Sequence, residues 1–300
     1  MPSIHEPVLL HETVESLKSA KGTPTYVDGT LGGAGHALAI AKAFNGNLRI
    51  IGLDRDQQAI ERARETLAGK ASEVILECEN FRNIDKVLAK HGVDKVDLIL
   101  LDLGISSDEL ENSGRGFSFQ KDEPLLMTMG DSATYPFTAR DILNDWKEED
   151  IANVIFAYGE EKYARRIARA VVEYRLKKKI ETTHELTEII RTAVPPMYRH
   201  RKLHPATKTF QALRIAVNDE LKALEQGLEK GYELLNEGGR LAVISFHSLE
   251  DRIVKNFMRD REKQGARLIS RRATKPTDQE IAENPRSRSA KLRVVEKHHI

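Results

Sequence analysis

A glycine-rich segment and two aspartates are the residues of this sequence best suited to chemistry. Residues 28–36 read DGTLGGAGH and directly follow an apolar run. Glycines there let the backbone turn tightly and approach a ligand that a Cβ atom would exclude. Asp54 ends the next apolar run, where its carboxylate can accept hydrogen bonds from ribose hydroxyls. The combination predicts an adenosine-containing cofactor, whereas the glycines alone would also suit a tight structural turn.

The glycine spacing favours S-adenosylmethionine over a nicotinamide dinucleotide. A dinucleotide fingerprint that opens at Gly33 requires a small residue at position 38, and the sequence has Leu38 there. We expect Asp28 at the mouth of the loop, where an acidic residue suits a sulfonium and an amino group better than a pyrophosphate. The loop is therefore predicted to bind S-adenosylmethionine.

The second of these aspartates, Asp102, ends a later apolar run and leads into a small polar loop that contains Ser106. Because the carboxyl ends of parallel strands share one edge of a sheet, we expect Asp102 beside the cofactor. The exocyclic amine of a base is a poor nucleophile, since its lone pair is conjugated with the ring. Hydrogen bonds from its N–H groups to Asp102 would favour the tetrahedral nitrogen that attacks a methyl group. Capping of the next turn is the alternative role of Asp102.

A parallel sheet with crossover helices is needed to position these side chains. In the first third of the sequence, apolar β-branched runs alternate with helical patterns. The runs predict buried strands at residues 25–28, 49–54, 73–78 and 96–102. The sequence thus predicts an α/β fold with a Rossmann-like sheet of the class I methyltransferase kind.

An all-helical domain is expected to interrupt this sheet. Residues 138–191 carry apolar positions at helical spacing. We assign residues 1–110 and 209–300 to the discontinuous core and residues 111–208 to the insert. In the second part of the core we expect a long helix at 208–235 stopped by residues 236–239, a strand at 239–246, a helix at 248–263, and strands at 267–270 and 291–296. Residues 271–289 are charged, contain two prolines and are expected to be mobile.

Composition limits the class of protein. The sequence has 300 residues, 40% of them hydrophobic, and no apolar run of the roughly 20 residues that span a bilayer. It also lacks a secretory pattern at its start, so we expect a cytoplasmic protein without a membrane partner. The single cysteine, Cys78, excludes an internal disulfide and is expected to be a buried, inert strand residue. No compact set of His, Asp and Glu predicts a metal.

The charged residues are unevenly distributed although the formal net charge is only +1. Residues 160–208 hold thirteen Lys or Arg and six Asp or Glu, including the basic residues Arg199, Arg201 and Lys202 beside His200. Such segregation suits a polyanionic partner. A solvated helix face is the equally weighted alternative for any single cluster.

From end to end the motifs resemble the bacterial 16S ribosomal RNA cytosine-N4 methyltransferases, the small-subunit methyltransferase H family. The segments that carry the resemblance are HEPVLL (5–10), DGTLGGAGH (28–36), LDLGISS (101–107), GRGFSF (114–119), KTFQA (208–212), ISFHSLEDR (244–252) and NPRSRS (284–289). The resemblance implies methylation of N4 of a cytidine, position 1402 in the usual numbering, in 16S rRNA of the assembled small subunit.

The resemblance also implies which residues form the site. The expected cofactor contacts are Asp28, Gly33, Ala34, Gly35, His36, Asp54, Phe81, Asp102 and Glu109. Asp102, Ser106 and His247 are the expected catalytic residues, with His247 as a substrate contact or, alternatively, a hydrogen-bonded structural residue. The expected RNA contacts are Arg115, Lys208, Arg252, Arg286 and Arg288, for which surface salt bridges are the alternative at Lys208 and Arg252.

Two departures from the family pattern concern the region near the expected active-site mouth. Where the family usually reads PLDMRMD, residues 124–130 read PLLMTMG, so that two acids and an arginine are missing. Glu109 stands where an uncharged cofactor contact is expected. These departures leave room for a changed substrate.

Other functions are open at this stage. A DNA amino-methyltransferase is the nearest alternative, but those enzymes carry a Pro-Pro-aromatic loop where this sequence has LGISS at 103–107. A non-catalytic RNA-binding or ribosome-assembly protein is a second alternative, motivated by residues 126–130. A dinucleotide oxidoreductase is least favoured. The sequence leaves a homodimer open.

Overall fold

The fold is described from a computed structural model that covers residues 7–18, 20, 22–199 and 203–298. His5 and Glu6 of the first motif and the basic cluster at 200–202 lie outside the described residues. The chain forms two compact units, residues 1–104 with 221–300 and residues 105–220, which are described separately. No helix of the described part is long and apolar enough to cross a membrane.

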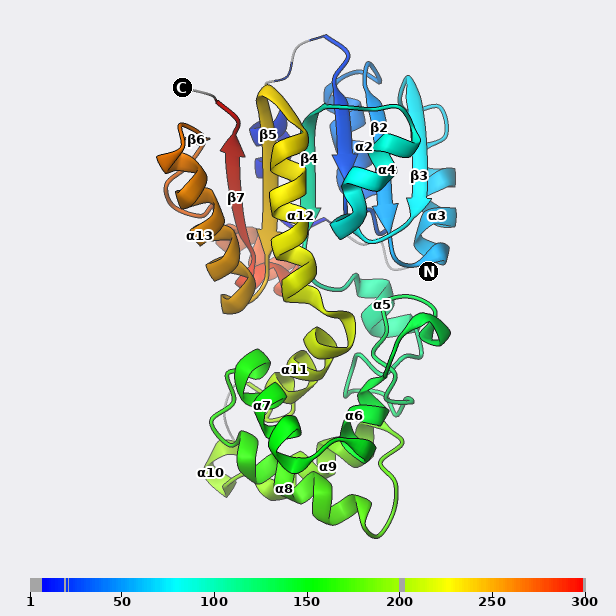
Figure 1. The fold of residues 1–300 in the computed structure, drawn as a ribbon, viewed down its shortest axis with the longest axis vertical. Helices are drawn as coiled ribbons and strands as arrows, with labels where there is room; N and C mark the ends of the chain where they lie inside the picture. Colours follow the sequence, from blue (N-terminus) through cyan, green and yellow to red (C-terminus); the bar gives the residue numbers. More distant parts are fainter. Residues whose placement is uncertain (1–6, 19, 21, 200–202, 299–300) are drawn as a thin grey trace. The chain divides into compact units, whose positions relative to one another are not determined.

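The first unit is built on a seven-stranded sheet with the order β3-β2-β1-β4-β5-β7-β6 (Figure 1). Strands β1 to β5 are parallel, and β7 is antiparallel to both β5 and β6. The strand bounds are β1 Thr25–Asp28, β2 Arg49–Asp54, β3 Glu73–Cys78, β4 Val96–Asp102, β5 Leu235–Ser245, β6 Arg267–Leu268 and β7 Lys291–Glu296. The predicted α/β fold with a Rossmann-like sheet is confirmed.

Helices cover both faces of the sheet because its central strands are apolar on both sides (Figure 1). One face packs against α4 (Ile84–Lys90), α12 (Glu220–Leu234) and α13 (Ser248–Lys263). The other packs against α1 (Leu10–Leu17), α2 (Gly35–Ala43) and α3 (Gln57–Leu67). The remaining elements are η1 (Phe81–Asn83), α14 (Asp278–Glu283) and η3 (Pro285–Ser289).

In its described part the second unit is helical apart from one isolated β-bridge, between Pro124 and Thr182. It has its own apolar core, to which α6 to α11 contribute. The helix bounds are α5 Ser107–Asn112, α6 Ala139–Asp145, α7 Glu148–Gly159, α8 Ala164–Arg175, α9 Thr183–Ala193, α10 Pro196–Arg199 and α11 Thr207–Asn218, with η2 at Ser132–Thr134.

The boundaries of the helical unit differ from the predicted 111–208. The unit begins at Ile105 and ends at Glu220, so α5 and α11 belong to it. The reason lies in packing, since Phe210, Leu213 and Val217 of α11 are buried in the core of the helical unit.

The long helix predicted at 208–235 is wrong, because it is broken into α11 and α12. Asp219 between them has a left-handed backbone with φ of 50°, which ends a helix. Nor do residues 236–239 form a stop segment. They lie within β5, where the backbone of Gly238 donates to the carbonyl of Lys297 at 2.8 Å.

Two further predictions fail. Residues 271–289 are not an unstructured segment, since they contain α14 and η3 and pair with β7 through a bridge between Thr274 and Leu292. Cys78 is a strand residue as expected, but it is exposed, because it ends the edge strand β3. Its Sγ lies 3.6 Å from the carbonyl oxygen of Arg55, and partial desolvation, followed by the nearby charge of Asp54, raises the pKa of the thiol.

Candidate active site

The glycine loop joins β1 to α2 at the carboxyl edge of the sheet, and close packing explains two of its glycines. A Cβ atom on Gly29 would lie 2.5 Å from the side chain of Leu101, and one on Gly35 would lie 2.4 Å from Pro7. Ala34 takes a left-handed backbone, with φ of 61°, immediately before α2. At Gly33, by contrast, an added Cβ would meet no atom within 4 Å. The loop is therefore held from behind and open at Gly33.

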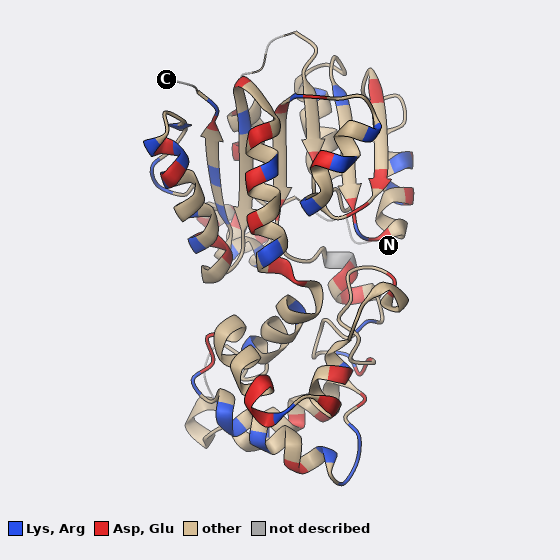
Figure 2. Ribbon diagram, viewed as in Figure 1, with Lys and Arg blue, Asp and Glu red and all other residues tan. Residues whose placement is uncertain are grey.

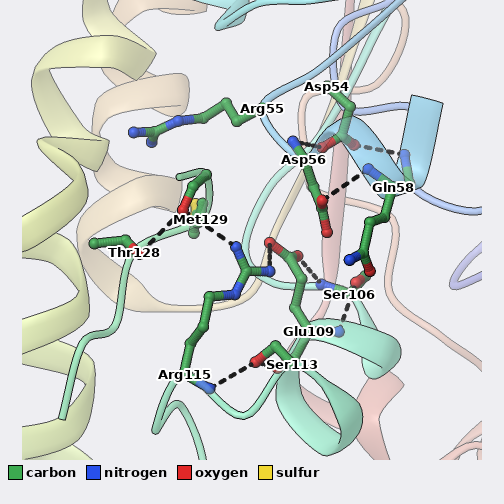
Figure 3. A network of polar contacts seen from close by, with 12 residues as sticks. Asp54, Arg55, Asp56, Gln58, Ser106, Glu109, Ser113, Arg115, Thr128 and Met129 are labelled. Atoms are coloured by element: carbon green, nitrogen blue, oxygen red, sulfur yellow. Dashed lines mark hydrogen bonds and ion pairs between the residues drawn. The ribbon is translucent and has the colours of Figure 1, made fainter. Parts of the chain in front are cut away.

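Asp54 ends β2 and fixes the loop from the neighbouring strand. Its Oδ2 accepts a hydrogen bond from the backbone N–H of Gly32 at 2.7 Å, and its Oδ1 accepts one from Asp56 at 2.9 Å (Figure 3). Burial raises the pKa of Asp54 above its usual value, while these hydrogen bonds oppose the rise. A carboxylate oxygen has two lone pairs, so Asp54 can still accept from a ligand hydroxyl.

Asp28 is buried, not at the mouth of the loop where we expected it, with only 1% of its surface exposed. Its Oδ2 accepts from the Tyr26 hydroxyl at 2.8 Å and its Oδ1 from the backbone N–H of Thr30 at 3.2 Å. Burial raises its pKa to about 6 despite these two bonds. Asp28 therefore supports the start of the loop from beneath.

Asp102 ends β4 and holds a carboxylate oxygen that lacks a partner. Its backbone N–H donates to Oγ1 of Thr30 at 2.6 Å, which ties the strand end to the glycine loop. Although 21% of the side chain is exposed, Oδ1 is buried and has no hydrogen-bond partner among the described residues. Burial, reinforced by the negative charges of Asp28 and Glu250, raises the pKa of Asp102 well above its usual value. The group is thus prepared to accept a hydrogen bond or a proton.

His36 lies in the first turn of α2 and faces Asp102. Its Nε2 is 3.0 Å from the carbonyl oxygen of Val8, which can only accept, so Nε2 carries the proton. In the neutral ring Nδ1 is then an acceptor, and it lies 3.6 Å from Oδ2 of Asp102. Two acceptors facing each other repel, and a single proton between them removes the repulsion. A proton that Asp102 takes up can therefore be shared with Nδ1 of His36.

His247 has a structural task at the carboxyl end of β5. It caps α13, where Nδ1 accepts from the backbone N–H of Glu250 at 3.4 Å. Its Nε2 is 3.1 Å from Oε1 of the same glutamate but makes no hydrogen bond among the described residues. Only 11% of the side chain is exposed. The structure thus gives His247 the role of a helix cap, and its role as a substrate contact stays a prediction.

Phe81 follows β3 and is held by a glycine of α12. A Cβ atom on Gly227 would lie 2.4 Å from Cδ2 of the Phe81 ring, and Phe81 also contacts the site of a Cβ on Gly29 at 3.0 Å. The ring is half-buried between these two backbone positions. Phe81 thus packs against the start of the glycine loop, and its role as a cofactor contact stays a prediction.

In the helical unit, three of the predicted residues form one local network. Ser106 caps α5, accepting from the backbone N–H of Glu109 at 3.1 Å, and Oε2 of Glu109 accepts from the backbone N–H of Ser106 at 2.9 Å (Figure 3). The guanidinium of Arg115 lies 3.8 Å from Glu109 and 5.7 Å from the Phe117 ring centroid. Ser106, rather than Asp102, caps this turn. Glu109 and Arg115 also form an ion pair with each other.

The remaining predicted RNA contacts differ in exposure. Lys208 donates from Nζ to the carbonyl of Glu160 at 2.7 Å and so completes the end of α7. Arg252, Arg286 and Arg288 are exposed on the first unit. Because β5 and β7 pair between Ser245 and Lys291, η3 with its two arginines lies at the carboxyl edge of β5.

Three residues of the site were not predicted from the sequence: Tyr26, Thr30 and Glu250. Tyr26 had a signal, since residues two apart on a strand face the same side, so Tyr26 and Asp28 had to point together. Glu250 occupies the third position after the cap of α13, where an acid closes a capping box. Thr30 carried no comparable signal, because its bond to Asp102 spans 72 residues of sequence.

Comparisons with known proteins agree on one family. The model of the MraW methylase family matches residues 2–298. The protein named ribosomal RNA small subunit methyltransferase H from Sulfurihydrogenibium sp. is 48% identical over 291 residues, covering 97% of this chain and 98% of the relative. The protein of the same name from Geobacter sulfurreducens is 48% identical over 310 residues, covering 98% of each.

Solved structures give more distant matches. An rRNA methylase from Streptococcus thermophilus is 12% identical, with a TM-score of 0.47, and 98% of each chain is covered. A Streptococcus mutans methyltransferase in complex with SAH is also 12% identical, with a TM-score of 0.48, covering 98% of this chain and 99% of that one. At these values the positions of site residues are not transferable.

Proposed function

The chain belongs to the MraW methylase family, and on that premise we propose that it methylates N4 of a cytidine in 16S rRNA of the small ribosomal subunit. The target in the usual numbering is position 1402. S-adenosylmethionine is the cofactor. The observation that carries the proposal is the buried, unpartnered Oδ1 of Asp102 beside the glycine loop, an acceptor suited to the N–H of an exocyclic amine.

The residues of the loop fit this cofactor. S-adenosylmethionine supplies an electrophilic methyl group on a positively charged sulfur. Asp54 would hold the ribose hydroxyls, and the open backbone at Gly33 admits the ligand. Burial raises the pKa values of Asp28 and Asp102, and a positively charged ligand beside them would favour their ionised forms.

For the acceptor, the work of the chain is to orient an amine and receive its proton. Asp102 Oδ1 accepts an N–H of the amine, which draws the nitrogen lone pair out of conjugation and holds it in line for attack. The nitrogen becomes positively charged when its bond to the methyl carbon forms. Its proton then passes to the ionised carboxylate of Asp102, where the neighbouring Nδ1 of His36 can share it.

The choice of substrate rests on the relatives, whose names specify ribosomal RNA of the small subunit. Small ribosomal subunits are cytoplasmic, which places the proposed reaction there. The loop after Asp102 supports RNA over DNA, since LGISS at 103–107 lacks the Pro-Pro-aromatic segment of DNA amino-methyltransferases.

Labelled S-adenosylmethionine and small subunits that lack the modification test the proposal. After incubation with the protein, the RNA is digested and its nucleosides are identified by mass spectrometry. We expect N4-methylcytidine at one position. A different methylated nucleoside would refute the N4 assignment, and intact cofactor binding without any methylated RNA would refute the substrate and implicate the departures at residues 126–130.

A further inference from the structure

Four cations gather around the first turns of α8 in the helical unit. Lys162, Arg165, Arg166 and Arg169 are all exposed, and the helical positions 165, 166 and 169 fall on one side by their spacing (Figure 2). We name these four residues the α8 ridge. Lys162 joins it through an aromatic ring, since its Nζ lies 4.9 Å from the centroid of Tyr163 and the Arg166 guanidinium lies 6.0 Å from the same ring.

Several cations of this unit form ion pairs with carboxylates, whereas within the described part of the chain three of the four residues of the α8 ridge do not. Lys178 pairs with Glu185, Arg191 with Glu188 and Arg140 with Glu181. Among the described residues, no carboxylate lies within ion-pair distance of Lys162, Arg165 or Arg166, and Arg169 has only a 3.8 Å contact with Glu148. Three of the four ridge cations thus lack a carboxylate partner among the described residues.

The nearest acid in the sequence is turned away from this surface. Glu161 is fully buried, accepts from the backbone N–H of Tyr163 at 2.8 Å, and accepts a second hydrogen bond from the hydroxyl of Tyr198. The rings of Tyr163 and Tyr198 meet edge to face at 5.0 Å. Glu161 therefore fixes the aromatic support of the α8 ridge without exposing its charge to solvent.

We infer that the α8 ridge binds the phosphodiester backbone of RNA, an inference that rests on the proposed function. Phosphate oxygens supply the negative partners that the ridge lacks, and arginine side chains bind phosphate in a bidentate manner. Backbone contacts of this kind position a nucleic acid without reading its sequence. The ridge would thus contribute affinity, while the choice of the methylated base is left to the active site.

A double variant and a charge-matched control test this inference in the full chain. R165Q/R166Q removes two charges from the ridge, and K178Q/R191Q removes two paired charges of the same unit. The probe is a fluorescein-labelled, unmodified transcript of the decoding region of 16S rRNA, and binding is followed by anisotropy at several salt concentrations. S-adenosylmethionine binding is measured by calorimetry on every variant.

For R165Q/R166Q we expect about a 10-fold weaker Kd near 0.15 M salt and a slope of log Kd against log salt smaller by about 1 to 2, because roughly one counterion is released per phosphate contact. K178Q/R191Q should bind RNA within about twofold of wild type, and both should keep their cofactor affinity. Equal slopes for the two variants, or no salt-dependent RNA binding by wild type, would overturn the inference. Wild type that binds RNA through the ridge but methylates no cytidine would overturn the proposed function alone.

Discussion

At the residue scale, several acidic side chains lie close to Asp102 beside the glycine loop. Asp28 and Glu250 raise the pKa of Asp102, and both are themselves buried, Asp28 beside Tyr26 and Glu250 beside His247. His36 is the nitrogen base that faces Asp102 from α2. Clusters of titratable side chains with perturbed pKa values are typical of functional sites, where these side chains gain or lose protons.

Replacing Asp102 distinguishes its role in methyl transfer from its contribution to the stability of the fold. We expect D102N to slow the chemical step by about 10²- to 10³-fold, because an amide is a weaker acceptor and cannot take up the proton. Thermal stability should stay the same or rise, since the buried charge is removed. Single-turnover methylation measures the first effect and calorimetric melting the second. Wild-type turnover in D102N would exclude Asp102 from the reaction.

Asp28 should make stability depend on pH in the direction opposite to an ion-paired aspartate. Its pKa rises from 3.8 in the unfolded chain to about 6 in the fold, so the folded state retains a proton that the unfolded state loses. The stability from this group is fully present below pH 3.8 and is lost as pH rises through 6, by ~3 kcal/mol in total.

The variant D28N cannot titrate and isolates this effect. We expect the free energy of unfolding of D28N, minus that of wild type, to increase by ~2.5 kcal/mol between pH 4 and pH 7. Urea denaturation at the two pH values measures it. A difference that does not change with pH would show that Asp28 is not perturbed.

At the element scale, α12 packs against the glycine loop indirectly. Gly227 of α12 contacts the ring of Phe81, and Phe81 in turn contacts the loop at Gly29. We expect G227A to weaken S-adenosylmethionine binding by about 10-fold, since the added Cβ would lie 2.4 Å from the Phe81 ring and must displace it. Isothermal titration calorimetry measures the affinity. G231A is the matched control on the same helix, because its Cβ would meet Ile99 at 3.5 Å, an ordinary contact.

The control should keep cofactor affinity and gain about 0.5 to 1 kcal/mol of stability, the usual benefit of alanine over glycine within a helix. Equal cofactor affinities for the two variants would mean that Phe81 does not contact the cofactor.

The elements of the sheet could be predicted closely, and the breaks between helices could not. β1 to β4 begin and end at the predicted residues because each is a short apolar run, and β1, β2 and β4 are each closed by an aspartate. The break at Asp219 carries no glycine or proline, and only a left-handed backbone marks it. The exposure of Cys78 depends on the strand order, which leaves β3 at the edge and which local sequence does not specify.

The candidate site shows the same division. Asp54 and Asp102 were expected at strand ends, and the structure has them there. Asp28 was expected at the mouth of the loop, yet it is buried beneath the loop by Tyr26 and Thr30. His36 of α2 faces Asp102 of β4, and the two residues are far apart in the sequence. No local sequence pattern therefore predicts this contact.

At the scale of the whole molecule, two units with separate cores should tolerate damage independently. Thr128 is fully buried in the helical unit, where its hydroxyl donates to the carbonyl of Gly130 at 3.1 Å. The related family usually has an arginine here between two acids, which this chain replaces with Leu126 and Gly130. T128R would therefore bury a charge without its partners and should destabilise the helical unit by about 3 to 5 kcal/mol.

Cofactor binding should survive this substitution, because the glycine loop belongs to the other unit. Urea unfolding followed by Trp146, a residue of the helical unit, measures the loss of stability, and calorimetry with S-adenosylmethionine measures binding. T128V, which removes only the hydroxyl, is the control and should cost about 1 kcal/mol. Parallel loss of cofactor affinity in T128R would show that the units do not fold separately.

The support behind the glycine loop comes from both ends of the chain. Val8 accepts from His36, the backbone N–H of Leu9 donates to Glu280 at 2.7 Å across 271 residues, and Arg240 donates to the carbonyl of Ser16 at 2.6 Å. During translation the N-terminal segment emerges first and waits for these partners. Until Glu280 has left the exit tunnel, the S-adenosylmethionine site of the nascent chain lacks part of its support. A polypeptide still attached to its ribosome should therefore bind S-adenosylmethionine poorly and transfer methyl groups slowly.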